Sequence, residues 1–374
     1  MKFRILLVLG VASLLAACGS ISNPRADMCS EPTDQPIVDA SLAAAIRDTL
    51  SLASGPTCAD LVTLTHIDAM GRNIATLTGL EHATNLQVVQ LNDNRIASLR
   101  PLTEITRLTH LWLAGNEVLD ASPLAGLTGL RGLSLSNNRI SNIGFVAGMN
   151  ELEALIIEGV PIGNGSILAN KPNLELLNAR DTGLTTLAPL ATSPLLRDLD
   201  VGENLLTDAS VVGTFAGLQR FMAGGNQIAD VSFLEGLAAL RTLELYSNSI
   251  TDTTAIATLT DLVSLDVSNL GLSNLAFLSA FTQLERLWAW GNELADANFV
   301  QDMTGLSGTV FIESNYIASL APLVANPAIA DGTVVAVQWN CLNLTAGSQA
   351  MADIDALVAR GAVVTYAQQK TSLC

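Results

Sequence analysis

The stretch Leu86-Gln87-Val88-Val89-Gln90-Leu91-Asn92-Asp93-Asn94-Arg95-Ile96 has apolar residues at its first, fourth, sixth and eleventh positions and an asparagine at its ninth. The same frame begins at a leucine every 22 residues, at Leu64, Leu86, Leu108, Leu130, Leu152, Leu174, Leu196, Leu218, Leu240, Leu262 and Leu284. With a slip of one residue a twelfth frame begins near Ser307, and a thirteenth begins near Gly332. A period held over this length indicates a repeat architecture in which neighbouring units stack.

Within each repeat, counted from its leucine as position 1, the pattern predicts one short strand. Apolar positions 4 and 6 point to the same side, as the alternation of a strand requires. Apolar positions 14 and 17, which are Leu99 and Leu102 in the second repeat, predict the buried side of a return segment. Because one repeat cannot bury its own apolar face, about 13 strands are expected to stack in parallel.

The asparagine at position 9 falls where each strand ends and the chain turns inward. Buried backbone at such a turn needs hydrogen-bond partners, and a side-chain amide can both donate and accept, so we predict a structural role. The column comprises Asn94, Asn116, Asn138, Asn204, Asn226, Asn248, Asn292, Asn315 and Asn340. Repeats five and six are irregular, and Gly165 and Lys171 stand at apolar positions of repeat five. A local bulge, a change of curvature or sequence drift would each account for this.

The pattern LxxLxLxxNxI resembles that of leucine-rich repeats, and its 22-residue form is similar to the internalin-like class of bacterial surface proteins. The resemblance covers residues 37–374. It implies an α/β solenoid, a leucine-rich repeat horseshoe with a parallel concave sheet and a helical cap at each end. We expect the N-terminal cap in residues 37–60, the repeats in residues 61–342 and the C-terminal cap in residues 343–374.

The caps are expected because an open solenoid would expose its last apolar layer to water. Before the repeats, apolar residues at helical spacing predict a helix over Asp39–Leu52, with Asp39 or Ser41 as its N-cap. After the repeats, the same spacing predicts a helix over Gln349–Arg360, followed by a short strand over Val363–Tyr366.

The chain begins MKFRILLVLGVASLLAACGS, a basic start followed by an apolar run that is too short to span a bilayer. We interpret residues 1–17 as a secretory signal peptide. Leu15-Ala16-Ala17-Cys18 resembles the bacterial lipobox, which implies a lipid on Cys18, and a proline-containing tether is expected over residues 18–36. In such lipoproteins a residue other than aspartate after the cysteine, here Gly19, points to the outer membrane of a Gram-negative cell. The alternative is an ordinary signal peptide with an incidental cysteine.

Five cysteines are an odd number, and assigning Cys18 to the lipid leaves four. Cys29 and Cys58 lie near one end of the array, whereas Cys341 and Cys374 lie near the other. We therefore predict the disulfides Cys29–Cys58 and Cys341–Cys374, which an exported, oxidising compartment permits. Four free buried thiols are the alternative.

The composition excludes several classes of function. The formal net charge is −17, and phosphate binding needs clustered Lys and Arg, so nucleic acid is not expected as a partner. No P-loop, dinucleotide-binding or GxSxG motif occurs, and Ser, His and Asp are too scattered for a catalytic triad. His66 and His110 share a column but lie two repeats apart, too far to hold one zinc ion. We expect no enzyme activity, no cofactor and no metal.

Aromatic residues gather at the positions predicted to face outward from the concave sheet, which are positions 3, 5, 7 and 8. All four tryptophans of the chain occupy such positions, with a tyrosine and a phenylalanine: Trp112, Tyr246, Trp288, Trp290, Phe311 and Trp339. Exposed aromatics on a rigid scaffold are typical of protein-binding surfaces, and they also suit stacking on sugar rings. They could instead stack on one another and stabilise the sheet.

The centre of the concave face is acidic. Its predicted members are Asp198, Asp200, Glu203, Glu244 and Asp266, and Arg180, Arg220 and Arg286 interrupt it. These carboxylates suit a cationic protein partner, although a solvated face of an acidic protein would look the same.

Together these observations predict a lipid-anchored protein of the cell envelope, expected to be a monomer, that binds a protein partner through its concave face. The aromatic residues and the acidic residues above are its candidate binding site. Binding of glycan or peptidoglycan through the same aromatics is the alternative. A structural envelope protein without a specific ligand is a third possibility.

Overall fold

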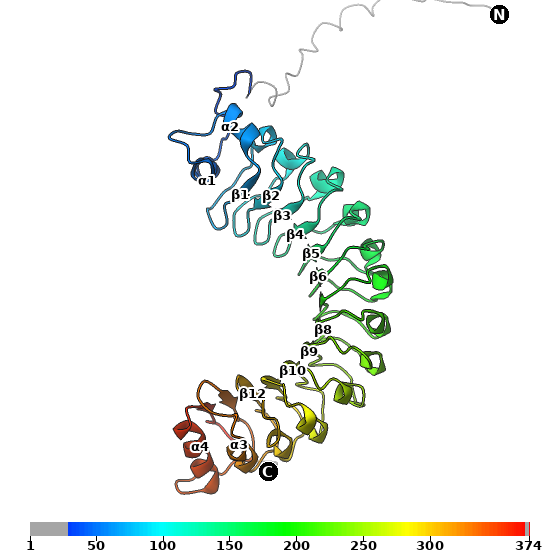
Figure 1. Cartoon of the computed structure of the whole chain (residues 1–374), viewed down its shortest axis with the longest axis vertical. Coiled ribbons are helices and arrows are strands. Elements are labelled where there is room, and N and C mark those ends of the chain that lie inside the picture. The colour runs from blue at the N-terminus through cyan, green and yellow to red at the C-terminus, as the bar shows by residue number, and fades with distance from the viewer. Residues whose placement is uncertain (1–28, 371–373) are drawn as a thin grey trace, which may run out of the picture.

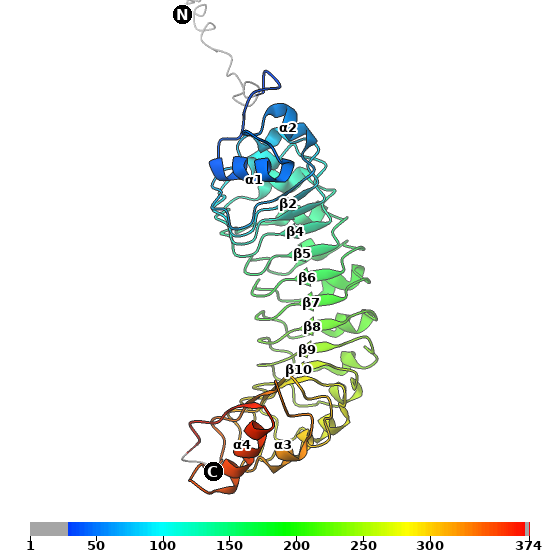
Figure 2. The same cartoon turned by 60° about the vertical axis from the view of Figure 1, so that its left-hand side comes forward.

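The computed structural model describes residues 29–370 and Cys374. The predicted signal peptide, Cys18 and the tether as far as residue 28 lie outside these residues. The described chain forms an arc, with one parallel sheet of fourteen strands, arranged in sequence order, along its inner curve (Figure 1). In the turned view the strands follow one another as successive rungs (Figure 2). The predicted leucine-rich repeat horseshoe with caps is confirmed.

The strands are three residues long and start 22 residues apart over most of the array. They are β1 (His66–Asp68), β2 (Val88–Gln90), β3 (His110–Trp112), β4 (Gly132–Ser134), β5 (Ala154–Ile156), β6 (Leu176–Asn178), β7 (Asp198–Asp200), β8 (Arg220–Met222), β9 (Thr242–Glu244), β10 (Ser264–Asp266), β11 (Arg286–Trp288), β12 (Thr309–Phe311), β13 (Val334–Ala336) and β14 (Val363–Thr365). The strands of the thirteen repeats pair at the same repeat position, so residues of one position form a column across the sheet.

The return segments on the outer curve carry short helices. The 3-10 helices are η1 (Leu80–His82), η2 (Arg100–Leu102), η3 (Ser122–Gly126), η4 (Gly144–Gly148), η5 (Ser166–Leu168), η6 (Ala188–Thr192), η7 (Ser210–Thr214), η8 (Ser232–Leu234), η9 (Ile256–Thr258), η10 (Ala276–Ala280) and η11 (Asn298–Val300), and one short α-helix, α3 (Ala321–Ala325), follows them. Between sheet and return segments lies a continuous apolar core.

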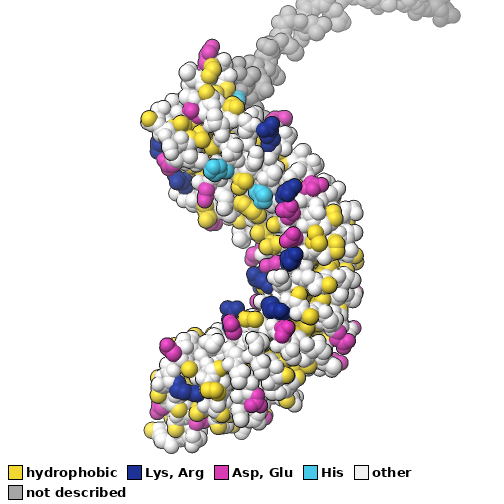
Figure 3. Space-filling model, in the orientation of Figure 1, with side chains coloured by type: hydrophobic (Ala, Val, Ile, Leu, Met, Phe, Trp, Pro, Cys, Tyr) yellow, Lys and Arg dark blue, Asp and Glu magenta, His cyan; other side chains and the backbone are white. Residues whose placement is uncertain are grey.

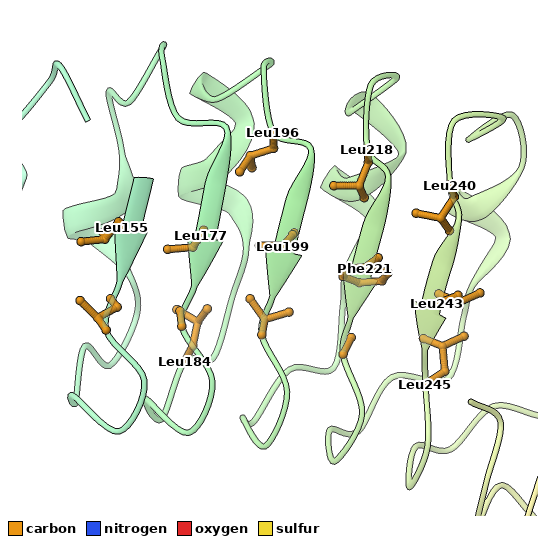
Figure 4. Packing of buried hydrophobic residues seen from close by; sticks show 14 of the residues in the cluster. Leu155, Leu177, Leu184, Leu196, Leu199, Leu218, Phe221, Leu240, Leu243 and Leu245 are labelled. Atoms are coloured by element: carbon orange, nitrogen blue, oxygen red, sulfur yellow. The ribbon is translucent and has the colours of Figure 1, made fainter. Parts of the chain in front are cut away.

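The core is built from columns of equivalent residues. Leu177, Leu199, Phe221 and Leu243 follow one another at position 4 of successive repeats and are fully buried (Figure 4). Burying one such side chain contributes roughly 1.5–3 kcal/mol. A register slip of one residue would turn this column to solvent, so the core fixes the register and thereby the outward columns.

The asparagine column is structural, as predicted. Asn226 is representative: its Nδ2 donates to the carbonyl oxygens of Val201 and Ala223, each at 3.0 Å, and its Oδ1 accepts from the Leu206 amide at 3.0 Å. One side chain thus ties its own repeat to the preceding one. Where Thr182 replaces asparagine, its hydroxyl still donates to the Ala179 carbonyl at 2.9 Å.

Position 8 has a backbone property that we did not predict. All thirteen residues at this position have a left-handed conformation, with φ between 51° and 75°. They are Gly71, Asp93, Gly115, Asn137, Gly159, Asp181, Glu203, Gly225, Ser247, Asn269, Gly291, Ser314 and Trp339. Gly, Asn and Asp adopt this conformation most readily, and they account for nine of the thirteen. The backbone turn is therefore the common requirement at position 8, and a contact made by the side chain is additional.

Repeat five fits into the sheet without a bulge. The strands β4 to β7 keep the common register, so the irregularity lies in the return segment, where Gly163, Gly165 and Asn170 have positive φ. Lys171 there is fully buried, and its Nζ donates to the carbonyl oxygens of Ala147 at 3.4 Å and Ala169 at 3.1 Å.

The N-terminal cap consists of α1 (Ala40–Leu50) and α2 (Cys58–Thr63), of which only the first was predicted. Asp39, one of the two predicted N-cap residues, accepts hydrogen bonds from the amides of Ser41 at 2.9 Å and Leu42 at 3.1 Å. Its second oxygen accepts from the Ala75 amide at 2.9 Å, which fastens α1 to the first repeat.

The C-terminal cap consists of α4 (Gln349–Ala359), which packs against α3 and β14, and of β14 itself, which continues the sheet. Both predicted disulfides, Cys29–Cys58 and Cys341–Cys374, are present. The first holds residues 29–36, predicted as part of the tether, to α2, with hydrogen bonds from Cys58 to Asp34 and from Ala59 to Pro32. Among the helices of the described chain, none is long and apolar enough to cross a membrane.

Candidate functional site

The register places most of the predicted binding residues in adjoining columns of the concave face. Position 5 holds Trp112, Asp200, Glu244, Asp266, Trp288 and Phe311, position 3 holds Asp198, position 7 holds Tyr246 and Trp290, and position 8 holds Trp339. Charged side chains of both signs follow the inner curve of the arc (Figure 3). The columns bring these residues onto one face, but they divide into separate groups along it.

Trp288, Trp290 and Phe311 form the first group, which we call the aromatic cluster. Trp288 on β11 pairs with Phe311 on β12, and their ring centroids lie 6.3 Å apart at an interplanar angle of 83°. The predicted contact of these two residues across neighbouring strands is confirmed, and their rings meet edge to face. Trp290 lies two residues farther along the same outward side. All three side chains are half-buried, so part of each stays accessible.

Tyr246 lies outside the aromatic cluster, in a polar network that we did not predict. Its hydroxyl donates to Glu203 Oε1 at 2.8 Å and accepts from Arg180 Nη2 at 2.9 Å. Arg180 and Glu203 also form an ion pair at 3.1 Å. Burial raises the pKa of Tyr246, so the phenol remains protonated and able to donate. The network spans repeats six to nine.

Two glycines make this network possible. The Arg180 side chain extends over Gly202, and the Tyr246 ring lies so close over Gly224 that a Cβ there would overlap it. Gly202 and Gly224 both occupy position 7, between the position-7 residues Arg180 and Tyr246. The sequence carried a signal for this network: in the position-7 column, two successive glycines stand between two large polar residues.

Trp112 and Trp339 stand apart from the aromatic cluster. Trp112 lies 6.2 Å from the ring of His110, and both rings occupy the space over Gly132 on the next strand. Trp339 sits in the turn of the last repeat with φ of 54°, and it is 48% exposed. The six predicted aromatics therefore lie at four places, and only the aromatic cluster joins more than one of them.

Of the predicted acidic residues, Glu203 is exposed and lies in the network of Tyr246, and the other four are partly buried. Asp198 is paired with Arg220 at 3.3 Å, and Asp200 accepts from the Gly202 amide at 3.0 Å. Glu244 and Asp266 occupy directly paired positions on β9 and β10. Burial raises the pKa of all four carboxyl groups, and the charges of Asp266 and Asp200 raise the pKa of Glu244 further.

Glu313 is an acidic member of the face that we did not predict. It follows Phe311 by two residues at position 7, beside Trp290 on the next strand, as the hydrogen bond from the Gly291 amide to its carbonyl at 3.0 Å shows. Burial and the charge of Asp266 raise the pKa of its carboxyl group. Its Oε2 is buried without a hydrogen-bond partner, as is Oε1 of Gln338 in the next repeat.

The geometry gives no support to a metal centre within the described residues, because no three or more His, Cys, Asp or Glu side chains converge there. His66 and His110 flank Val88 in the position-3 column, as predicted. What the concave face offers is a rigid surface with aromatic and acidic groups.

Comparisons with known proteins agree with this architecture. The family model described as leucine-rich repeats, in two copies, matches residues 84–126. The crystal structure of an internalin, InlF, from Listeria monocytogenes is 25% identical and covers 91% of this chain and 100% of its own, with a TM-score of 0.78. Internalin C2 of the same organism is 29% identical over 59% of this chain and 100% of its own, with a TM-score of 0.54.

A leucine-rich repeat protein of Leptospira interrogans shares the fold at 19% identity, covering 84% of this chain and 80% of its own, with a TM-score of 0.66. No curated protein matches the sequence. The repeat period, the unbroken parallel sheet and these likenesses show a leucine-rich repeat solenoid that is similar to the bacterial internalins.

Proposed function

We propose that this protein is a non-catalytic, lipid-anchored module of the cell envelope that binds a protein partner through its concave face. The leucine-rich repeat fold supports a protein–protein interaction module, because its extended concave sheet presents many side chains on a rigid frame. The acidic composition argues against nucleic acid as the partner.

The observation that carries this proposal is the aromatic cluster. Trp288 and Trp290 are large, half-buried side chains, Trp288 at the end of β11 and Trp290 in the turn that follows it. The core and the pairing of β11 with β10 and β12 fix their register. Such preorganised aromatics lose little conformational entropy on binding, and tryptophan is among the commonest residues that dominate interface energies. These tryptophans are not part of the fully buried apolar core.

The test compares full-length wild-type protein with a Trp288→Ala, Trp290→Ala variant, each expressed in its own cells and cross-linked before purification. A protein recovered with the wild type and lost with the variant would support the concave site. Trp339→Ala is the matched control, because it removes an exposed tryptophan outside the aromatic cluster. A partner recovered equally with all three proteins would place binding elsewhere.

Binding of a glycan through the aromatic cluster is the competing function, and isolated cell wall serves as its probe. Retention of the wild type on cell-wall glycan, loss of retention in the double variant and no recovered protein partner would replace the protein-binding proposal by the glycan-binding one.

The lipid anchor rests on the sequence around Cys18. We expect labelled palmitate to enter the wild-type protein and not a Cys18→Ser variant, and we expect the variant to leave the outer-membrane fraction. Equal labelling of both, or an unchanged membrane fraction, would contradict the anchor without affecting the binding site.

A further inference from the structure

The aromatic cluster is bordered by one carboxylate from the repeat before it and one from the repeat after it. Asp266 on β10 is directly paired with Trp288, and Glu313 lies beside Trp290 in the repeat of β12. The two carboxyl groups are close enough for the charge of Asp266 to raise the pKa of Glu313. A ligand that rests on the two tryptophans therefore meets negative charge on both sides.

Glu313, Asp266 and the neighbouring Glu244 form no ion pair with a Lys or Arg among the described residues. No Lys or Arg nitrogen lies within ion-pair distance of Glu244, Asp266 or Glu313, whereas Asp198 is paired with Arg220. Glu244 and Asp266 face each other across neighbouring strands, and like charges in that relation destabilise a sheet. Within the described residues, no direct ion pair offsets this repulsion.

The charges of Arg180 and Arg220 lower the pKa of Glu244, but neither arginine is ion-paired with Glu244, Asp266 or Glu313. Arg180 pairs with Glu203, and Arg220 pairs with Asp198. Arg286 precedes Trp288 by two residues, but its side chain lies close to Gly308, at the start of the next repeat, and it forms no ion pair. The group with spare acceptor capacity is the pair of carboxylates: one oxygen of Asp266 accepts from the Ser268 amide at 2.9 Å, and Glu313 Oε2 has no partner.

Aromatic faces beside carboxylates that have no ion pair are the elements that recognise an organic cation. A guanidinium or ammonium group is attracted to the face of a tryptophan ring, and a carboxylate beside the ring adds an ion pair. The edge-to-face geometry of Trp288 and Phe311 leaves one of the two rings with both faces uncovered by the other. Arginine fits best, because its planar group can stack on a ring and donate to two carboxylates at once.

We propose that the aromatic cluster, with Asp266 and Glu313 on either side, binds an arginine or lysine side chain from a basic segment of the partner protein. The inference rests on the proposed function and specifies the chemistry of its site. A neutral sugar would stack on the same rings, but its hydroxyl groups would leave the repulsion between the carboxylates in place. A cation removes that repulsion, and the net charge of −17 would attract a basic segment from a distance.

The test is calorimetric titration of the full-length protein with a tetra-arginine peptide and with a tetra-citrulline peptide of the same length. Citrulline keeps the planar group and removes its charge. We expect saturable binding of the arginine peptide and binding at least about tenfold weaker for citrulline. Asp266→Asn and Glu313→Gln should each weaken arginine binding by roughly tenfold, about 1.4 kcal/mol. Trp288→Ala should do the same.

The control variant is Asp302→Asn, which makes the same change in net charge on an exposed return segment. It should change the affinity less than about twofold, which is within the long-range effect of one screened charge. An equal loss in Asp302→Asn and Asp266→Asn would show nonspecific attraction and overturn the inference. Equal binding of the two peptides, or chitotetraose binding that Trp288→Ala abolishes and Asp266→Asn does not change, would also overturn it.

Failure of cation binding can be distinguished from failure of the proposed protein-binding function. A cross-linked partner lost in the double tryptophan variant but retained in Asp266→Asn and Glu313→Gln would uphold the protein-binding site and reject the cation. All variants are compared by thermal melting, so a loss of affinity in a protein that melts like the wild type reports on the site. Glu313→Gln is the conservative variant, because it keeps the shape of the side chain.

Discussion

At position 8 of every repeat one residue turns the chain in a left-handed backbone conformation. Two requirements act on the choice of residue there: the backbone conformation and, in some repeats, the contacts of the side chain. Most are Gly, Asn or Asp, which suit the backbone. Glu203 and Trp339 do not suit it. Backbone strain of this kind is commonly kept at functional sites, where a side chain is needed despite its conformational cost. For Glu203, the ion pair with Arg180 and the hydrogen bond from Tyr246 offset the strain.

Trp339 allows the strain to be measured. We expect Trp339→Asn to raise the free energy of unfolding by up to about 1 kcal/mol, because asparagine tolerates the left-handed region and the tryptophan is half exposed. Urea unfolding of both proteins measures the difference. Placing a tryptophan at position 8 of another repeat, by Gly291→Trp, should destabilise the protein. A loss of more than about 1 kcal/mol in Trp339→Asn would mean that the ring contributes packing that outweighs the strain.

Lys171 is a second residue at odds with its surroundings, since burial lowers the pKa of its ammonium group. The unfolded chain then binds the proton more tightly than the folded one, so stability rises with pH between the folded-state pKa and the ordinary value of 10.5. We expect Lys171→Met to be more stable at pH 7 by about 1 kcal/mol and to lack this rise.

Urea unfolding of both proteins at pH 7 and pH 10 checks the Lys171 prediction, and the difference between them cancels the titration of other groups. The change removes the donor to the carbonyls of Ala147 and Ala169, which limits the gain. Methionine occupies the equivalent place in repeats four and eleven as Met149 and Met303, so its volume is accommodated there. A larger pH dependence in the variant than in the wild type would contradict the assignment.

At the scale of the elements, a large side chain of one repeat lies over a glycine of the repeat before it, as the Tyr246 ring does over Gly224. Gly224→Ala places a methyl group against the Tyr246 ring and should destabilise the protein by roughly 1–3 kcal/mol through overpacking. In a Tyr246→Ala background the same change should be nearly neutral. Thermal or urea unfolding of the four proteins forms a double-mutant cycle, and equal effects of Gly224→Ala in both backgrounds would show that the ring is not the obstacle.

Strands and columns were predictable because two periods act together in the sequence. Alternation over positions 3 to 6 decides which side chains face outward, and the 22-residue period decides which of them become neighbours. The pairing of Trp288 with Phe311 followed from these periods and from the one-residue slip before the twelfth repeat. The location of Tyr246 did not, because its contact with Glu203 spans two repeats and depends on side-chain length and on Gly224.

The N-terminal cap was predicted in part for a similar reason. The helix α1 has apolar residues at a regular helical spacing, whereas α2 has only six residues and is fixed by Thr57 and Asp60, which cap each other's backbone. A helix of that length shows no periodicity, and its capping pair is the available signal. Residues 29–36 are held to α2 by the disulfide of Cys29 and by backbone hydrogen bonds. The hydropathy pattern contains no signal for either kind of contact, so this segment was predicted as tether.

For the whole molecule, the two disulfides fasten the ends of an array whose repeats contact mainly their neighbours. They close loops of 29 and 33 residues, and each restricts the unfolded chain by roughly 3.5 kcal/mol in the chain-entropy model. We expect reduction to increase amide hydrogen exchange in the caps and the adjacent repeats, and to leave the central repeats protected. Exchange measured by mass spectrometry with and without reductant checks this. Uniform loss of protection along the array would instead show that the chain unfolds as one unit.

The common register of the thirteen repeats bears on how such a chain can change its length through evolution. Removing residues 262–283, one whole period, would join two equivalent points of the chain and leave every remaining column in place. Asp266 would be lost, but Glu244 would then stand opposite Trp288, and a carboxylate would still border the ring. Gains and losses of single repeats can therefore resize the binding face while keeping its chemical order, provided that each unit of exchange is a full 22 residues.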